Sequence, residues 1–194
     1  GLVNKVDVSH FRLSLHLTTA FIILTLILWQ IFNLKIKLNS NSEYIGFKLP
    51  EIFIFLIFLQ IIVGAFVSGM DAGKIYNSWP LMGSTFFPND NNLYNLFNLS
   101  SFSEPSLVQF MHRNLAYVIM SVYLITIYLV ISNKLIKFNK TVIVLGLILL
   151  FQIVLGIFTV TSGAQMFIAS MHQISSILLV SFSVYFLFIN TKKN

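Results

Sequence analysis

Two histidines stand at matching positions in two long apolar stretches of the chain. His112 is the sixth residue of the stretch at 107–133, and His172 is the sixth residue of the stretch at 167–190. An ionisable side chain inside such a stretch is costly to bury, so each histidine is a candidate functional residue. A histidine that is hydrogen-bonded to a neighbouring helix is the structural alternative for either one alone.

The match in position predicts a shared depth for the two imidazoles. If both stretches are helices that run in the same direction, each ring lies about 8 Å below one face, at about 1.5 Å per residue. Two neutral imidazoles that approach from opposite sides are a natural axial pair for a haem iron, and apolar helix walls would shelter the macrocycle. His112 and His172 therefore favour a bis-histidine haem site.

Other metals fit these residues less well. The chain has no cysteine, so a metal must be held by His, Met or oxygen ligands. Zinc or copper would need a third or fourth ligand. The candidates nearest in sequence, Asp71, Glu104 and Met171, make a poor set, because Met171 lies about 100° around its helix from His172.

Two arginines and two further histidines lie near the same face. Arg113 follows His112, and Arg12 precedes His16 by one helical turn, so both could form charge-assisted bonds to haem propionates. Snorkelling to lipid headgroups is the alternative. His16 is also the sixth residue of its stretch, but it has no visible partner histidine. His10 precedes that stretch, and we expect it in water or among the headgroups.

The elements that must position these residues follow from composition. Of 194 residues, 57% are hydrophobic, 9% are charged and 20 are Phe, which no soluble domain could cover with polar surface. A helix that spans a bilayer needs about 20 mostly apolar residues. The sequence predicts an all-α polytopic membrane protein whose five transmembrane helices lie at 11–34, 51–70, 107–133, 139–161 and 167–190.

The net charge of +6 follows the connections between these helices. On one side the lysines have few acidic neighbours, and on the other side the charges balance. This bias predicts that the first side faces the cytoplasm or matrix, and it argues against a nucleic-acid partner. The lysines of that side are Lys35, Lys37, Lys48, Lys134, Lys137, Lys140, Lys192 and Lys193. The opposite side has Lys5, Arg12, Lys74 and Arg113 with Asp7, Asp71, Asp90 and Glu104.

Two helices share a pair of small and polar residues. Gln60 and Gly64 in one recur as Gln152 and Gly156 in the other, with the same spacing. Four residues apart, the glutamine and the glycine share a helical face, so each pair forms a flat notch beside a hydrogen-bonding amide. Ordinary helix packing with an interhelical amide bond is the alternative to a cofactor notch, and the repetition favours the cofactor.

A second repeated motif relates the first predicted helix to the last. Ser14-Leu-His16 recurs as Ser170-Met-His172. If these two helices are the last helices of two equivalent repeats, residues 51–194 form a complete four-helix unit, and residues 1–34 form the last helix of an earlier unit. The loop at 35–50 then joins the two units. The chain begins with Gly instead of Met, and we expect three further helices upstream.

The connection at 71–106 is much longer than the others, and a loop of this length usually has a function. Tyr76 and Trp79 suit a cap that lies at the membrane interface. For the Asn-rich run at 89–98, a solvated and partly disordered connector is the alternative.

Five segments together resemble one family. They are VSHFRLSLHL at 8–17, GAFVSGMDAGKIYNSWPLMG at 64–83, VQFMHRNLAY at 108–117, QIVLG at 152–156 and MHQ at 171–173. The chain resembles haem A synthase, the membrane enzyme of cytochrome oxidase assembly, in its alphaproteobacterial and mitochondrial form. The match covers nearly the whole chain. Two departures are His10, where relatives tend to have Pro, and Ser78-Trp79 in place of Thr-Phe.

The resemblance implies two pseudo-symmetric four-helix halves, of which the first holds the substrate haem and the second a haem b. It implies that His112 and His172 ligate the haem b iron. His16 would be the catalytic residue that ligates the substrate haem iron, with its partner histidine and a nearby glutamate on the missing helices. The remaining residues of the cofactor site would be Arg113, Gln60, Gly64, Gln152 and Gly156.

The implied reaction oxidises a methyl group of haem O to the formyl group of haem A, in two steps, with water supplying the oxygen. Haem O would be delivered by haem O synthase, and the enzyme would lie in a bacterial inner membrane or the mitochondrial inner membrane. The sequence does not identify the electron acceptor. It also leaves open whether the protein forms a homo-oligomer. This chain is expected to hold haem b but not to make haem A alone.

Two other classes of function stay open at this stage. The first is a bis-histidine cytochrome b that transfers electrons without substrate chemistry. The second is a transporter in which the histidines relay protons and the Gln/Gly notches bind solute.

Overall fold

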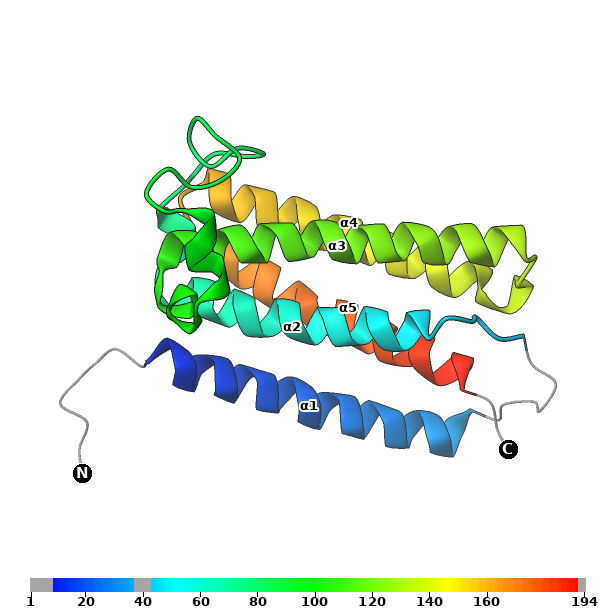
Figure 1. Ribbon diagram of the computed structural model, residues 1–194. Coiled ribbons are helices and arrows are strands. Elements are labelled where there is room, and N and C mark those ends of the chain that lie inside the picture. The colour runs from blue at the N-terminus through cyan, green and yellow to red at the C-terminus, as the bar shows by residue number, and fades with distance from the viewer. Residues whose placement is uncertain (1–8, 37–42, 192–194) are drawn as a thin grey trace, which may run out of the picture.

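The computed structural model describes residues 9–36 and 43–191, and this part of the chain contains five long helices and no strand (Figure 1). All five are long and apolar enough to cross a membrane, which confirms the predicted fold class. Each predicted span agrees with its helix to within two residues at either end. The helices are α1 (His10–Lys35), α2 (Leu49–Gly69), α3 (Pro105–Ser132), α4 (Asn139–Thr161) and α5 (Met166–Asn190).

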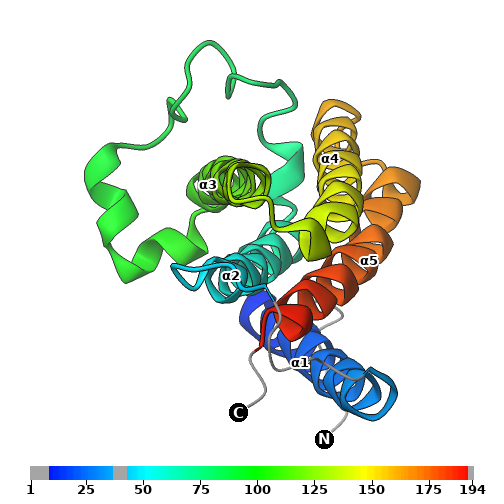
Figure 2. The same cartoon turned by 90° about the vertical axis from the view of Figure 1, so that its right-hand side faces the viewer.

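Helices α2 to α5 form an antiparallel four-helix bundle, and α1 lies along its outside (Figures 1 and 2). Around the bundle, α2 packs on α3, α3 on α4, α4 on α5 and α5 on α2. Helices α3 and α5 therefore occupy diagonal positions and run in the same direction. Helix α1 packs against α2 and α5.

The two ends of the bundle differ in their connections. One end carries the long connection between α2 and α3, and we call it the loop end; the other carries the α3–α4 turn, and we call it the basic end (Figure 1). The basic end holds Lys35, Lys48, Lys134, Lys137 and Lys140, as the charge pattern predicts. Lys5, Asp7, Lys37, Lys192 and Lys193 lie outside the described residues.

Local sequence accounts for several of the helix boundaries. Helix α3 begins at Pro105, whose missing N–H is not needed in the first helical turn. The tight turn between α4 and α5 uses Gly163 and Ala164, both of which have positive φ. The short turn forces α4 and α5 to lie side by side, and this contact positions the second of the paired histidines.

Side chains of the basic end join two connections to the last residues of α5. Asn190 is buried, and its amide accepts a hydrogen bond from the Ile45 N–H at 2.8 Å and donates to the Ile45 carbonyl at 3.3 Å. The Lys137 N–H donates to Glu43 at 2.9 Å, and the Lys137 ammonium donates to the Ile189 carbonyl at 2.6 Å. These bonds fix the α1–α2 connection and the α3–α4 turn to the end of α5.

The long connection at the loop end has a defined conformation. It contains three short 3-10 helices, η1 (Ala72–Lys74), η2 (Leu93–Phe97) and η3 (Leu99–Ser103), and an isolated bridge between Met82 and Thr85. Within the Asn-rich run, the Asn92 side chain accepts a hydrogen bond from the Asn95 N–H at 3.2 Å and so caps η2. The structure therefore shows an ordered arrangement where a disordered connector was the alternative.

Candidate functional site

His112 rests on a glycine of the neighbouring helix. A Cβ built on Gly64 of α2 would lie 3.0 Å from the Cε1 atom of His112, closer than side chains normally approach. One turn earlier, the Gln60 amide donates to the His112 carbonyl at 3.1 Å, and its Nε2 lies 3.2 Å from the His112 Nε2. The glycine makes room for the ring, and the glutamine fixes the backbone beneath it.

His172 has the same kind of seat on α4. A Cβ on Gly156 would lie 3.1 Å from the His172 Cε1 atom. The Gln152 amide donates to the His172 carbonyl at 2.9 Å. The Ser175 hydroxyl is in hydrogen-bonding contact with Gln152 Oε1 and, at 3.0 Å, with the His172 carbonyl. Each Gln/Gly notch thus receives a histidine from the next helix, and we call the two arrangements the α2–α3 seat and the α4–α5 seat.

The two seats lie at nearly the same level of one bundle. His112 is the eighth residue of α3, and His172 is the seventh residue of α5, counted from the loop end. The Nδ1 atoms of both rings are buried and lack a hydrogen-bond partner. A buried polar nitrogen without a partner is costly, so each ring has an unmet polar group inside the bundle. Within the described residues, no three His, Cys, Asp or Glu side chains cluster as a metal site.

Arg113 holds the long connection against α3. Its guanidinium donates to the carbonyls of Ser78 at 2.8 Å, Leu81 at 3.2 Å and Tyr76 at 2.9 Å. The Gln109 side chain, which is 2% exposed, donates to the same Tyr76 carbonyl at 2.9 Å. Sequence reasoning assigned Arg113 to the cofactor site, and here its two terminal nitrogens bind loop carbonyls while its Nε is buried without a partner.

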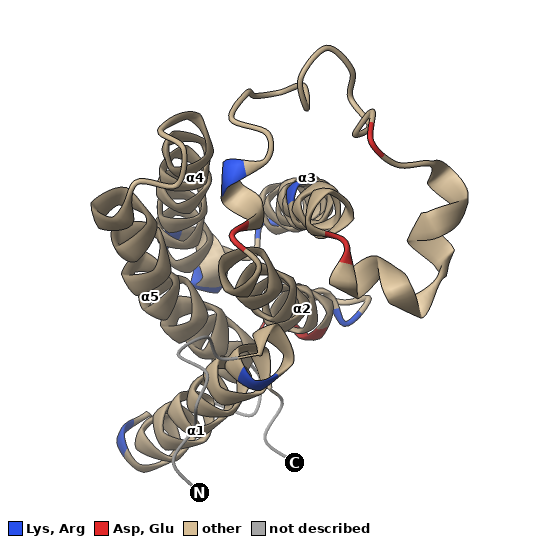
Figure 3. Ribbon diagram, turned by 90° about the vertical axis from the view of Figure 1, so that its left-hand side faces the viewer, with Lys and Arg blue, Asp and Glu red and all other residues tan. Residues whose placement is uncertain are grey.

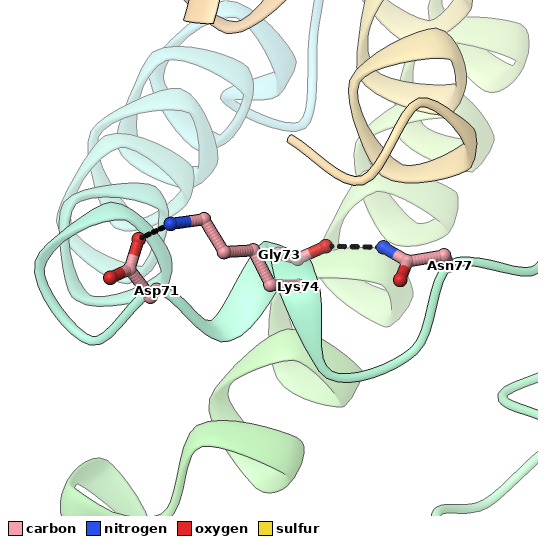
Figure 4. A network of polar contacts seen from close by, with 4 residues as sticks. All are labelled: Asp71, Gly73, Lys74 and Asn77. Carbon is pink, nitrogen blue, oxygen red and sulfur yellow. Dashed lines mark hydrogen bonds and ion pairs between the residues drawn. The ribbon is translucent and has the colours of Figure 1, made fainter. Parts of the chain in front are cut away.

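A second anchor ties the start of the connection to α4. Figure 4 shows the contacts within this segment, from Asn77 to Gly73 and from Lys74 to Asp71. The Asn77 amide donates to the Gly73 carbonyl at 2.9 Å and to the Val160 carbonyl near the end of α4 at 3.1 Å. Asp71 and Lys74 form an ion pair at 2.8 Å, but both side chains are exposed, so the pair adds little stability. The amide of Asn77 links this segment to α4.

A hydrogen bond also joins the two arms of the connection. The Tyr76 hydroxyl donates to Asp90 at 2.7 Å. Burial and this bond to a carboxylate raise the pKa of Tyr76, so the phenol keeps its proton at neutral pH. Together with Arg113, which binds the Tyr76 carbonyl, this bond fixes both ends of the tyrosine.

The histidines of α1 do not join either seat. His16 and Arg12 are exposed on α1, on a face that no described helix covers. We expected His10 in water or among the headgroups, and it is half-buried at the start of α1, against the end of α2. Its ring stacks edge-on against Phe66 at 5.7 Å, its Cα lies 2.9 Å from a Cβ built on Gly69, and its Nε2 is buried without a partner.

Sequence reasoning missed three polar residues of the site, namely Gln109, Ser175 and Asn77. The first two carried a usable signal, since Gln109 precedes His112 by three residues and Ser175 follows His172 by three, which places each on the histidine's helical face. Asn77 carried no such signal, because its contact with α4 depends on the path of the loop.

The family described as cytochrome oxidase assembly protein matches residues 1–184 of the chain. The chain belongs to this family. Similar curated proteins named heme A synthase include those of Pelagibacter ubique, 44% identical over 199 residues, and Rickettsia felis, 40% identical over 196 residues. The alignments cover 100% and 97% of this chain but 56% and 57% of those proteins. No solved structure matches the chain.

Family membership confirms the resemblance that the motifs indicate. With its five apolar helices, the chain is a multi-pass membrane protein. The chain spans somewhat more than half the length of the curated relatives named here.

The bonds of Arg113 lead to a prediction about the loop. Arg113→Met keeps the length of the side chain but removes its donors, and a hydrogen bond to a charged group contributes about 1.5–3 kcal/mol. We expect amide hydrogen exchange across residues 76–83 to become at least about tenfold faster, as measured by mass spectrometry. Arg12→Met is the matched control and should leave this exchange unchanged. Equal exchange in the Arg113 variant and the unaltered protein would contradict the assignment.

Proposed function

We propose that this chain contributes to haem A biosynthesis, in which a methyl group of haem O is oxidised to the formyl group of haem A. The observation that carries the proposal is the pair of histidine seats at one level of the bundle. The heme A synthase names of its relatives point to the same chemistry. Because the chain covers little more than half of these relatives, the activity would belong to a longer protein.

The residues of the two seats fit a haem b held by two histidines. Each ring has a buried Nδ1 without a partner and rests on a glycine where a Cβ would make a tight contact with the ring. In this role His112 and His172 would hold the haem iron, and the bound haem would supply electron-transfer chemistry. Gln60 and Gln152 would hold the ligand backbones in place, as outer partners commonly do at metal sites.

His16 would serve the substrate haem. It lies on the uncovered face of α1, whose opposite face packs on α2 and α5. In the proposed arrangement this face belongs to a first four-helix half, whose last helix is residues 1–34, and residues 51–194 form the second half. The first half would bind haem O, which haem O synthase would deliver. Water would supply the oxygen in two two-electron oxidation steps, and the four electrons and four protons released in total would leave to an electron acceptor outside this chain.

The charge pattern supports an orientation in the membrane. The lysines of the basic end would face the cytoplasm or matrix, and the loop end would face the opposite compartment of a bacterial inner or mitochondrial inner membrane. Both seats would then lie near the outer surface, beneath the connection that Arg113 holds.

The seats lead to a prediction about bound haem. In the full-length protein, His112→Ala and His172→Ala should each abolish haem b binding, because each removes an axial ligand. The visible spectrum of the purified protein measures this loss. His10→Ala is the control and should keep the spectrum of the unaltered protein. A normal low-spin spectrum in either ligand variant would refute the pairing.

The proposed reaction is tested through His16. We expect His16→Ala to stop the conversion of haem O while haem b remains bound, as measured by chromatography of extracted haems and by the visible spectrum. Unchanged haem A production would remove His16 from the active site. If the unaltered full-length protein binds haem b but makes no haem A, the electron-transfer cytochrome replaces the synthase.

The glycines lead to a separate prediction about the shape of the seats. Gly64→Ala and Gly156→Ala should each push the imidazole aside, since overpacking of this kind costs about 1–3 kcal/mol. At limiting haem we expect occupancy to fall by about tenfold, with an altered low-spin spectrum. Gly46→Ala is the matched control, because a Cβ there meets nothing within 4 Å. Haem binding as strong as that of the control would show that the seats do not position the ligands.

A further inference from the structure

The part of the long connection at residues 91–103 contains no charged residue and exposes large apolar side chains. Leu93 is 61% exposed, Tyr94 84%, Phe97 89% and Leu99 89%. A water-soluble surface rarely groups such side chains in so short a segment, and exposed apolar groups of this kind mark contact surfaces. These four residues, on η2 and at the start of η3, form what we call the η2–η3 face.

The η2–η3 face lies beside the bundle and does not cover the end of the bundle. Helices η2 and η3 are placed to the side of α3, away from α4 and α5, and level with the loop ends of the long helices (Figures 1 and 2). Phe102 of η3 holds them there through its ring contact with Phe66 of α2, at 5.7 Å. In a membrane-spanning protein this level corresponds to the boundary between headgroups and acyl chains.

Three asparagines of the segment bind one another and the start of α3, although the buried Ser101 hydroxyl has no partner. The Asn95 N–H donates to the Asn92 carbonyl at 3.1 Å, and the Asn95 amide donates to Asn91 Oδ1 at 2.8 Å. The Asn91 amide in turn donates to the Ser106 hydroxyl of α3 at 3.2 Å. Because these groups have partners, the segment can leave water at a lower cost than a solvated loop.

We propose that the η2–η3 face inserts into the lipid interface and anchors the long connection to the bilayer. Tyrosine and phenylalanine beside aliphatic residues are typical of interfacial segments. The segment has no charge of its own (Figure 3), and Asp90 and Glu104 border it, which keeps its two ends in water. A bilayer fits this surface better than a charged protein partner, since the face offers no charge complementarity.

Spin labelling tests the proposal directly, because the chain contains no cysteine. Single cysteines would be introduced as Phe97→Cys and Leu99→Cys in the full-length protein, reconstituted in phosphatidylcholine nanodiscs. Ser84→Cys, in the exposed turn of the same connection, is the water reference. Phe151→Cys, which is exposed in the middle of α4, is the lipid reference. Accessibility to oxygen, which concentrates in lipid, is compared with accessibility to a water-soluble nickel chelate.

We expect the labels at 97 and 99 to be more accessible to oxygen than to the chelate, with a depth between those of the two references. Adding anionic lipid should leave this depth unchanged, because the segment carries no charge. Chelate accessibility equal to that at residue 84 would overturn the proposal in favour of a solvated loop. Low accessibility to both reagents would overturn it in favour of a protein that covers the face.

Discussion

The arrangement of this protein depends on the close approach of two imidazoles to two glycines of neighbouring helices. Each ring occupies the space where a Cβ would be, so each histidine helix can lie close to its partner at this level only because the partner has Gly64 or Gly156 there. The glutamine one turn away binds the histidine carbonyl and fixes the register of the two helices. The four-residue spacing between glutamine and glycine therefore sets both the space for the imidazole ring and the level of the ring along the bundle.

The long connection is coupled to this arrangement through α3. Arg113 follows His112 directly, and adjacent residues on a helix point about 100° apart, so one side chain can face α2 while the next faces the loop. Any shift of α3 that moves the ring would also move the guanidinium and the carbonyls that it binds. Asn77 adds a link to α4, and the η2–η3 face would add one to the bilayer.

Helix α1 stands apart from this pattern. Its inner face packs on α2 and α5, while its other face, which carries His16, is covered by no described helix. In α5, by contrast, His172 has Gly156 and Gln152 of α4 beside it. The proposed partner of His16 would lie in the length by which the curated relatives exceed this chain.

The sequence by itself determined the five spans, because apolar runs of about 20 residues have few alternatives to a membrane helix. It also determined the family, the pairing of His112 with His172 as candidates, and the recurrence of Gln and Gly at one spacing. The sequence did not decide what the two Gln/Gly notches hold, because a glycine leaves space for a helix, a cofactor or a side chain equally well. The occupant of each notch depends on which helices are neighbours and how each is rotated about its axis. The same holds for Arg113, whose acceptors are carbonyls 32 to 37 residues earlier, and for His10, which is half-buried because α1 begins against the end of α2. Such contacts between distant segments exist only in the tertiary structure, since no local pattern encodes the path that brings them together.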